Sequence, residues 1–109
     1  MGHDILMFNK KGKEVGYLRF SMDDRLADTI YDIYDVKQFN GFVSGKGDQK
    51  TFTKEEIRAA YESYQTDKPS FTVYTNEKYH ALRRNEIDTF IQTSVDTVNE
   101  EGEVTIYFG

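Results

Sequence analysis

The stretch FNGFVSGKGDQKTFTKEE, residues 39–56, contains the clearest local signals in this chain. A short aromatic run at residues 39–43 leads into a glycine-rich loop, and the loop leads into the start of a helix. Thr53 can accept a hydrogen bond from the first turn, and Glu56 can accept one from the backbone of Thr53, which is the capping-box pattern. The stretch therefore predicts a loop followed by a helix over residues 54–65.

Size and charge limit what surrounds this stretch. The chain has 109 residues, close to the commonest domain size, so we expect one α+β domain over residues 1–109. Its net charge is −5, from 19 acidic and 14 basic residues. Because nucleic-acid phosphates are also negative, this charge disfavours a nucleic-acid partner.

Cysteine is absent, which excludes disulfides, thiolate metal sites and cysteine nucleophiles. The apolar run near the N-terminus, residues 5–8, is too short for a signal peptide or a membrane span. These features predict a cytoplasmic protein without a membrane partner. The many Lys, Tyr, Asn and Ile residues give the impression of a bacterial or phage protein.

Before the glycine-rich loop, two β-like runs at residues 5–8 and 15–20 are separated by turn residues, which predicts a hairpin. Ser21 is suited to cap a following helix over residues 23–36. The apolar residues of that helix recur at helical spacing: Leu26, Ile30, Ile33 and Tyr34.

After the second helix, residues 71–74 form another short β-like run. Asn85 can cap a third helix that ends before Gly102, a suitable left-handed C′ residue. Whether residues 77–84 belong to this helix stays open. The chain then alternates apolar and polar residues over 104–108, which predicts a strand paired with the hairpin. The expected fold is α+β, with a small antiparallel or mixed sheet and about three helices packed on it.

The glycine-rich loop is a candidate ligand or anion site. Backbone N–H groups in such loops can bind phosphate or carboxylate. The spacing does not match a P-loop, and an ordinary turn that needs positive φ is the simpler interpretation. The candidate residues are Ser44, Gly45, Lys46, Gly47 and Lys50.

Two histidines and a carboxylate form a candidate metal site. His3, Asp4 and His80 are suitable ligand types, although nothing in the sequence shows that they meet. The alternatives are a flexible terminal histidine and a surface histidine on a helix. We expect no cofactor.

The first helix offers a candidate partner-binding surface. Its acidic stripe could attract a basic partner, or could simply be a solvated helix face. Tyrosines on this helix are suited to contact surfaces and equally to a partly buried core. The candidate residues are Asp24, Asp28, Tyr31, Asp32 and Asp35.

No serine lies in a nucleophile-elbow motif, so the sequence identifies no catalytic residue. Our leading hypothesis is a non-enzymatic binding or regulatory module that acts through protein–protein contact. The alternative is a small-ligand or metal-dependent enzyme that uses residues 44–50 with His3 or His80. A third hypothesis is an acidic inhibitor or immunity-type protein. A homodimer could form if the C-terminal strand paired between chains.

Overall fold

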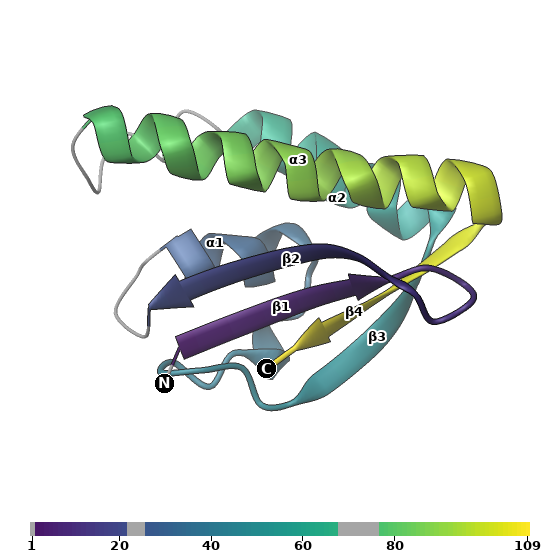
Figure 1. The fold of residues 1–109 in the computed structure, drawn as a ribbon, viewed down its shortest axis with the longest axis horizontal. Coiled ribbons are helices and arrows are strands. Elements are labelled where there is room, and N and C mark those ends of the chain that lie inside the picture. Colours follow the sequence, from purple (N-terminus) through teal and green to yellow (C-terminus); the bar gives the residue numbers. More distant parts are fainter. Residues whose placement is uncertain (1, 22–25, 68–76) are drawn as a thin grey trace.

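The computed structural model describes residues 2–21, 26–67 and 77–109, with side chains described up to residue 66 and from residue 84 onward. Within these residues, four strands and three α-helices form an α+β fold, as predicted (Figure 1). The elements are β1 (Gly2–Phe8), β2 (Glu14–Ser21), α1 (Leu26–Ile33), the 3₁₀ helix η1 (Lys37–Phe39), β3 (Asp48–Thr53), α2 (Lys54–Asp67), α3 (Glu77–Glu101) and β4 (Glu103–Phe108).

The four strands form one antiparallel sheet in the order β2-β1-β4-β3. The predicted hairpin and its pairing with the C-terminal strand are both confirmed. Ile5 lies opposite Leu18 of β2 on one side and opposite Phe108 of β4 on the other. Strand β4 is paired along both edges, with β1 and with β3, within one chain.

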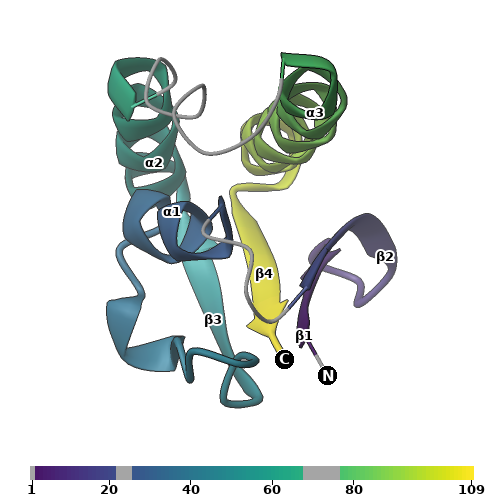
Figure 2. The same cartoon turned by 90° about the vertical axis from the view of Figure 1, so that its left-hand side faces the viewer.

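The helices pack on one face of the sheet (Figure 2). Residues alternate along β1 and β4, so every second side chain enters the core between sheet and helices. Tyr34 lies near the centre of this core. Its ring contacts those of Phe52 and Phe90 edge-on, and its hydroxyl lies 3.1 Å from Ser94 Oγ. This tyrosine is core, not contact surface, and burial raises its pKa well above the ordinary value.

The capping box at the start of α2 is confirmed. The Thr53 N–H donates to Glu56 Oε1 over 3.0 Å, and the Glu56 N–H donates to Thr53 Oγ1 over 3.2 Å. Lys50 Nζ lies 2.7 Å from Glu56 Oε2. The contact with Lys50 and the backbone bond from Thr53 lower the pKa of Glu56 below its usual value.

Strand β3 occupies part of the stretch that the sequence predicted as loop. Its sequence, DQKTFT, is polar, and Phe52 is the strand residue that lies fully in the core. Such an edge strand lacks the apolar alternation that identifies strands in a sequence. The preceding aromatic run, residues 39–43, contains the end of η1 and a bend.

Several helix boundaries also differ from the sequence prediction, and α1 ends at Ile33 instead of at residue 36. Helix α3 continues through Asn85, because its packed apolar stripe outweighs the capping preference of one residue. Ser21 is the last residue of β2, and α1 is described only from residue 26; residues 22–25 and 71–74 lie outside the described chain. Gly102 has φ +84°, and its N–H donates to Val98 O, which confirms the predicted helix end.

Candidate functional site

Residues 39–47, here called the 39–47 loop, form a tight projection between η1 and β3. Asn40 and Gly45 pair in an isolated antiparallel bridge, and the Gly41 N–H donates to Ser44 O over 2.9 Å. This pairing places Phe42 and Val43 at the tip of the loop. The loop is therefore a folded unit, not an open connection.

The two phenylalanines of the loop lie in opposite environments. The ring of Phe39 packs against that of Phe108, with 5.7 Å between their centroids. Phe42 is 81% exposed, and the adjacent Val43 is 47% exposed. An isolated exposed apolar residue is ordinary, but two at the tip of a projecting loop form a small apolar knob.

The backbone at Phe42 is held in a conformation that a bulky residue rarely adopts. Its φ is +74°, in the left-handed region that favours glycine. Such a residue costs about 1–3 kcal/mol and persists only where surrounding contacts hold it. Two contacts do so: the Phe42 N–H donates to Asn40 Oδ1, and the Phe42 carbonyl accepts a bond from His3 Nε2, each over 2.9 Å.

His3 connects this loop to the core. Its side chain is buried, and its Nδ1 lies 2.9 Å from the Tyr31 hydroxyl. A carbonyl can only accept, so Nε2 carries the proton toward Phe42, and in the neutral ring Nδ1 accepts from Tyr31. Burial, with a smaller contribution from the charge of Asp28, raises the pKa of Tyr31 to about 12, so its hydroxyl stays protonated at neutral pH.

These contacts decide what the predicted metal residues can do. Both ring nitrogens of His3 have partners inside the protein, so neither is free for a metal ion. Asp4 follows His3 on β1 and therefore points to the other face of the sheet. His80 lies near the start of α3, and its side chain is outside the described part. Within the described residues, no three His, Asp or Glu side chains form a group that could hold a metal.

The predicted anion site is also occupied by contacts within the protein. The N–H groups of Gly45, Lys46 and Gly47 donate to the carbonyls of Gly109, Phe39 and Phe108 respectively, over 2.9–3.0 Å. They therefore do not point toward a ligand. Gly45 is required for close approach, because a Cβ there would lie 2.4 Å from Phe108 O. Ser44 Oγ donates to Gly45 O, and Lys50 pairs with Glu56.

The acidic stripe on α1 is partly used to hold the same loop. Asn40 Nδ2 donates to Asp28 Oδ1 over 2.9 Å, and Asp32 lies 3.8 Å from Lys37 Nζ. Asp35 is exposed with φ +57°, and Asp24 lies outside the described residues. Tyr31 is fully buried, so its side chain does not belong to this exposed face.

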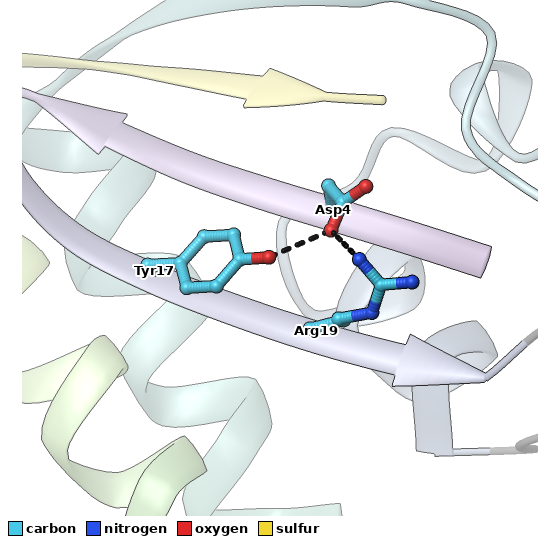
Figure 3. Close-up of polar contacts among 3 residues, drawn as sticks. All are labelled: Asp4, Tyr17 and Arg19. Atoms are coloured by element: carbon cyan, nitrogen blue, oxygen red, sulfur yellow. Dashed lines mark hydrogen bonds and ion pairs between the residues drawn. The ribbon is translucent and has the colours of Figure 1, made fainter. Parts of the chain in front are cut away.

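A second polar cluster lies on β1 and β2, on the sheet face away from the helices. The Tyr17 hydroxyl donates to Asp4 Oδ1 over 2.8 Å, and Arg19 Nη1 lies 3.2 Å from the same oxygen (Figure 3). The sequence analysis missed both this cluster and the projection of Phe42. Alternation along the two predicted strands could have indicated the cluster, whereas no local signal distinguishes Phe42 from Phe39.

A groove of about 480 Å³ lies between α2 and α3. Four of its polar side chains bond in pairs: the Tyr64 hydroxyl donates to Asp88, and Gln92 Nε2 donates to Asp96 Oδ1. Burial and the contact with Asp88 raise the pKa of Tyr64 above its ordinary value. These bonded side chains in the lining are the Tyr64 phenol, the Asp88 and Asp96 carboxylates and the Gln92 amide.

The chain matches no protein-family model, no curated protein and no solved structure closely enough to indicate a relationship. No helix in the described ranges is both long and apolar enough to span a membrane.

Proposed function

We propose that this protein is a non-enzymatic binding or regulatory module that acts through protein–protein contact, with Phe42 as the anchor. The supporting observation is the held conformation of the 39–47 loop. Phe42 is 81% exposed and adopts φ +74°, yet hydrogen bonds from His3 and to Asn40 fix its backbone on both sides. A fold that stabilises an unfavourable backbone to project an apolar ring is typical of a contact site.

Preorganisation is the physical advantage of this arrangement. Binding usually loses affinity because loops and side chains must be ordered at the interface. Here the backbone of the tip is already ordered. The free energy gained by burying the Phe42 ring and Val43 is therefore reduced by only a small additional entropy cost. Aromatic residues that fill a pocket on the partner commonly dominate the energetics of an interface.

The shape and charge of the site define the kind of partner. A convex knob requires an apolar pocket on the partner. Asp28 lies beside the loop through Asn40, and the chain as a whole carries −5, so basic residues should surround that pocket. The proposal places this contact in the cytoplasm of a bacterial or phage-infected cell, and it involves no nucleic acid.

Site-specific photo-crosslinking in the native cell tests the proposal. A photoreactive phenylalanine analogue replaces Phe42 in one sample and Tyr61, which is 37% exposed on α2, in the control. We expect a protein partner crosslinked from position 42 and not from position 61. With that partner purified, Phe42→Ala should weaken binding at least tenfold, as loss of an interface anchor does, whereas Tyr61→Ala should leave it unchanged.

Two results would contradict the proposal. One is equal crosslinking from both positions, which would indicate non-specific contact. The other is a partner whose affinity for Phe42→Ala equals its affinity for the wild type. Far-UV circular dichroism of each variant checks that the fold is retained, and Phe42→Ala should retain it because its side chain lies outside the core.

A further inference from the structure

The two edges of the sheet differ in how they are protected. Strand β3 forms one edge and β2 forms the other (Figure 2). On β3, Lys50 lies on the same side of the strand as Phe52, toward the helices, and its Nζ is 5.0 Å from the centre of the Phe52 ring. A charged residue that points inward discourages another strand from pairing with an edge. On β2, the residues on this side are Gly16, Leu18 and Phe20, none of which is charged.

The edge of β2 presents backbone groups at Tyr17. The Asp4 N–H donates to Gly109 O and the Gly109 N–H donates to Asp4 O, so both backbone groups of Asp4 face β4 and not β2. Because backbone groups alternate along an antiparallel strand, Leu6 also directs its groups toward β4. Tyr17 lies opposite Leu6, and its N–H and C=O therefore point away from β1. Within the described ranges, β2 pairs with β1 alone.

A groove of about 340 Å³ lies beside this edge, between β2 and α3. Val15 and Phe90 line it with apolar side chains, and Gly16 lines it without a side chain. A Cβ at Gly16 would lie 3.3 Å from the Phe90 ring, so the glycine lets the ring approach the strand. A glycine inside a strand often marks a place where another backbone comes close. Of the residues that line the groove, Glu86 on α3 is the charged one.

The edge and the groove together match an extended peptide. A strand added beside β2 would run about 4.8 Å from it. The peptide residue opposite Tyr17 would exchange two backbone hydrogen bonds with it, and the side chain of that residue would lie on the face away from the helices. The next residue along the peptide would direct its side chain toward α3, beside Gly16, where the groove can accept it.

We propose that an extended segment of a protein partner adds to β2 as a fifth strand and places an apolar side chain in the groove between β2 and α3. In strand addition, backbone hydrogen bonds provide affinity and side-chain pockets provide specificity. Lys or Arg beside the apolar residue fits the carboxylates of Glu86 and of Glu14, which is exposed at the start of β2. A second copy of this chain is a poorer occupant, because each copy carries a net charge of −5.

Selection from a displayed library of random peptides, each about nine residues long to match β2, tests the proposal. The wild type is the bait and Asn85→Trp is the counter-bait, because Asn85 is exposed on α3 and lines the groove. We expect enriched sequences that carry one aliphatic or aromatic residue flanked by Lys or Arg. The most enriched sequence, synthesised as a free peptide, is the probe for the measurements that follow.

Two pairs of variants separate the groove from the edge, and titration calorimetry with the synthetic peptide measures their affinities. Asn85→Trp should bind at least tenfold more weakly than the wild type, whereas Asn99→Trp, at an exposed asparagine further along α3, should bind like the wild type. Tyr17→Pro and Tyr17→Ala both remove the ring, but Pro also removes the outward N–H. Tyr17→Pro should therefore bind at least tenfold more weakly than Tyr17→Ala. Circular dichroism checks that each variant is folded.

Amide hydrogen exchange of the wild type gives a measurement that needs no variant. Leu18 lies opposite Ile5 and directs its N–H toward β1, whereas the Tyr17 N–H points outward. In the free protein, the Tyr17 amide should exchange at least tenfold faster than the Leu18 amide. A saturating concentration of the peptide should slow exchange at Tyr17 at least tenfold, because this N–H then donates to the added strand.

Several results would overturn the proposal. One is a library in which no sequence is enriched on the wild type over Asn85→Trp. Another is a peptide that binds both members of each variant pair equally. A Tyr17 amide that is protected without peptide would show that other residues of the chain, or a second copy, already cover the edge. Binding that is lost in Phe42→Ala would place the peptide at the 39–47 loop instead. The proposed contact through Phe42 is tested separately by crosslinking, so either proposal can fail alone.

Discussion

The two faces of the sheet are built from neighbouring residues of the same strands, yet their physical roles differ. On β1, His3, Ile5 and Met7 are buried beneath the helices. Asp4 and Leu6 point to the opposite face of the sheet, which the described helices leave uncovered. The covered face holds the fold together through close packing. The uncovered face buries less side-chain area, so substitutions there should cost less stability. Comparing adjacent residues of one strand therefore measures how much each face contributes to the free energy of unfolding.

The sharpest comparison is between two aliphatic neighbours on β1. Ile5→Ala removes a fully buried side chain and should lower the free energy of unfolding by about 2–5 kcal/mol. Leu6→Ala truncates a partly exposed side chain and should cost about 1 kcal/mol or less. Urea denaturation measures both changes in the free energy of unfolding. Equal losses of stability in the two variants would mean that the two faces of β1 contribute equally to folding, which would contradict this comparison.

The next effect lies where the 39–47 loop meets the end of the covered face. Gly45→Ala would place a Cβ 2.4 Å from Phe108 O and 2.8 Å from the Tyr31 hydroxyl. Because backbone must move to relieve this overlap, we expect a loss of about 1–3 kcal/mol. Ser44→Ala, next to it, removes one bond within the loop and should cost less than about 1 kcal/mol.

The same pair of variants tests how the loop is held. Gly45→Ala should also change the amide chemical shifts of Phe42 and Val43, because Gly45 forms the base of their turn through its bridge with Asn40. Two-dimensional NMR records these shifts together with the stability. Unchanged shifts at the tip, with reduced stability, would show that the tip does not depend on the packing at Gly45.

The smallest effect concerns the junction between β3 and α2. Thr53→Ala removes the acceptor for the Glu56 N–H and should lower the free energy of unfolding by about 1 kcal/mol at pH 7. The pKa of Glu56 is lower in the folded protein than its usual 4.5, so its contribution is present above pH 4.5 and is lost as the pH falls through the folded pKa.

Denaturation of wild type and Thr53→Ala at pH 7 and at pH 3 measures this contribution. The difference in unfolding free energy between the two proteins should be smaller at pH 3, because a protonated Glu56 no longer stabilises the Thr53–Glu56 capping box. Glu56 is partly exposed, so we expect the change to be a fraction of the total. A difference that is constant with pH would show that the Thr53 side chain and the Glu56 charge contribute independently of each other.

Local signals in the sequence determined a large part of this fold. The hairpin, the capping box at Thr53, the helix end at Gly102 and the C-terminal strand each depend on neighbouring residues, through alternation, caps or positive φ. Such features are readable because the interacting groups lie a few residues apart. The Asp4–Arg19 pair belongs to the same class, once the hairpin register is known.

Only the tertiary structure decided the remainder. The polar strand β3 exists because β4 offers it a partner, and the sequence of β3 alone does not indicate a strand. His3 holds Phe42 across 39 positions, so neither residue reveals its role locally. Phe39 and Phe42 are chemically identical, and one is packed while the other projects because Phe108 lies beside only the first. Burial in a loop depends on contacts with distant strands, and local sequence contains no record of them.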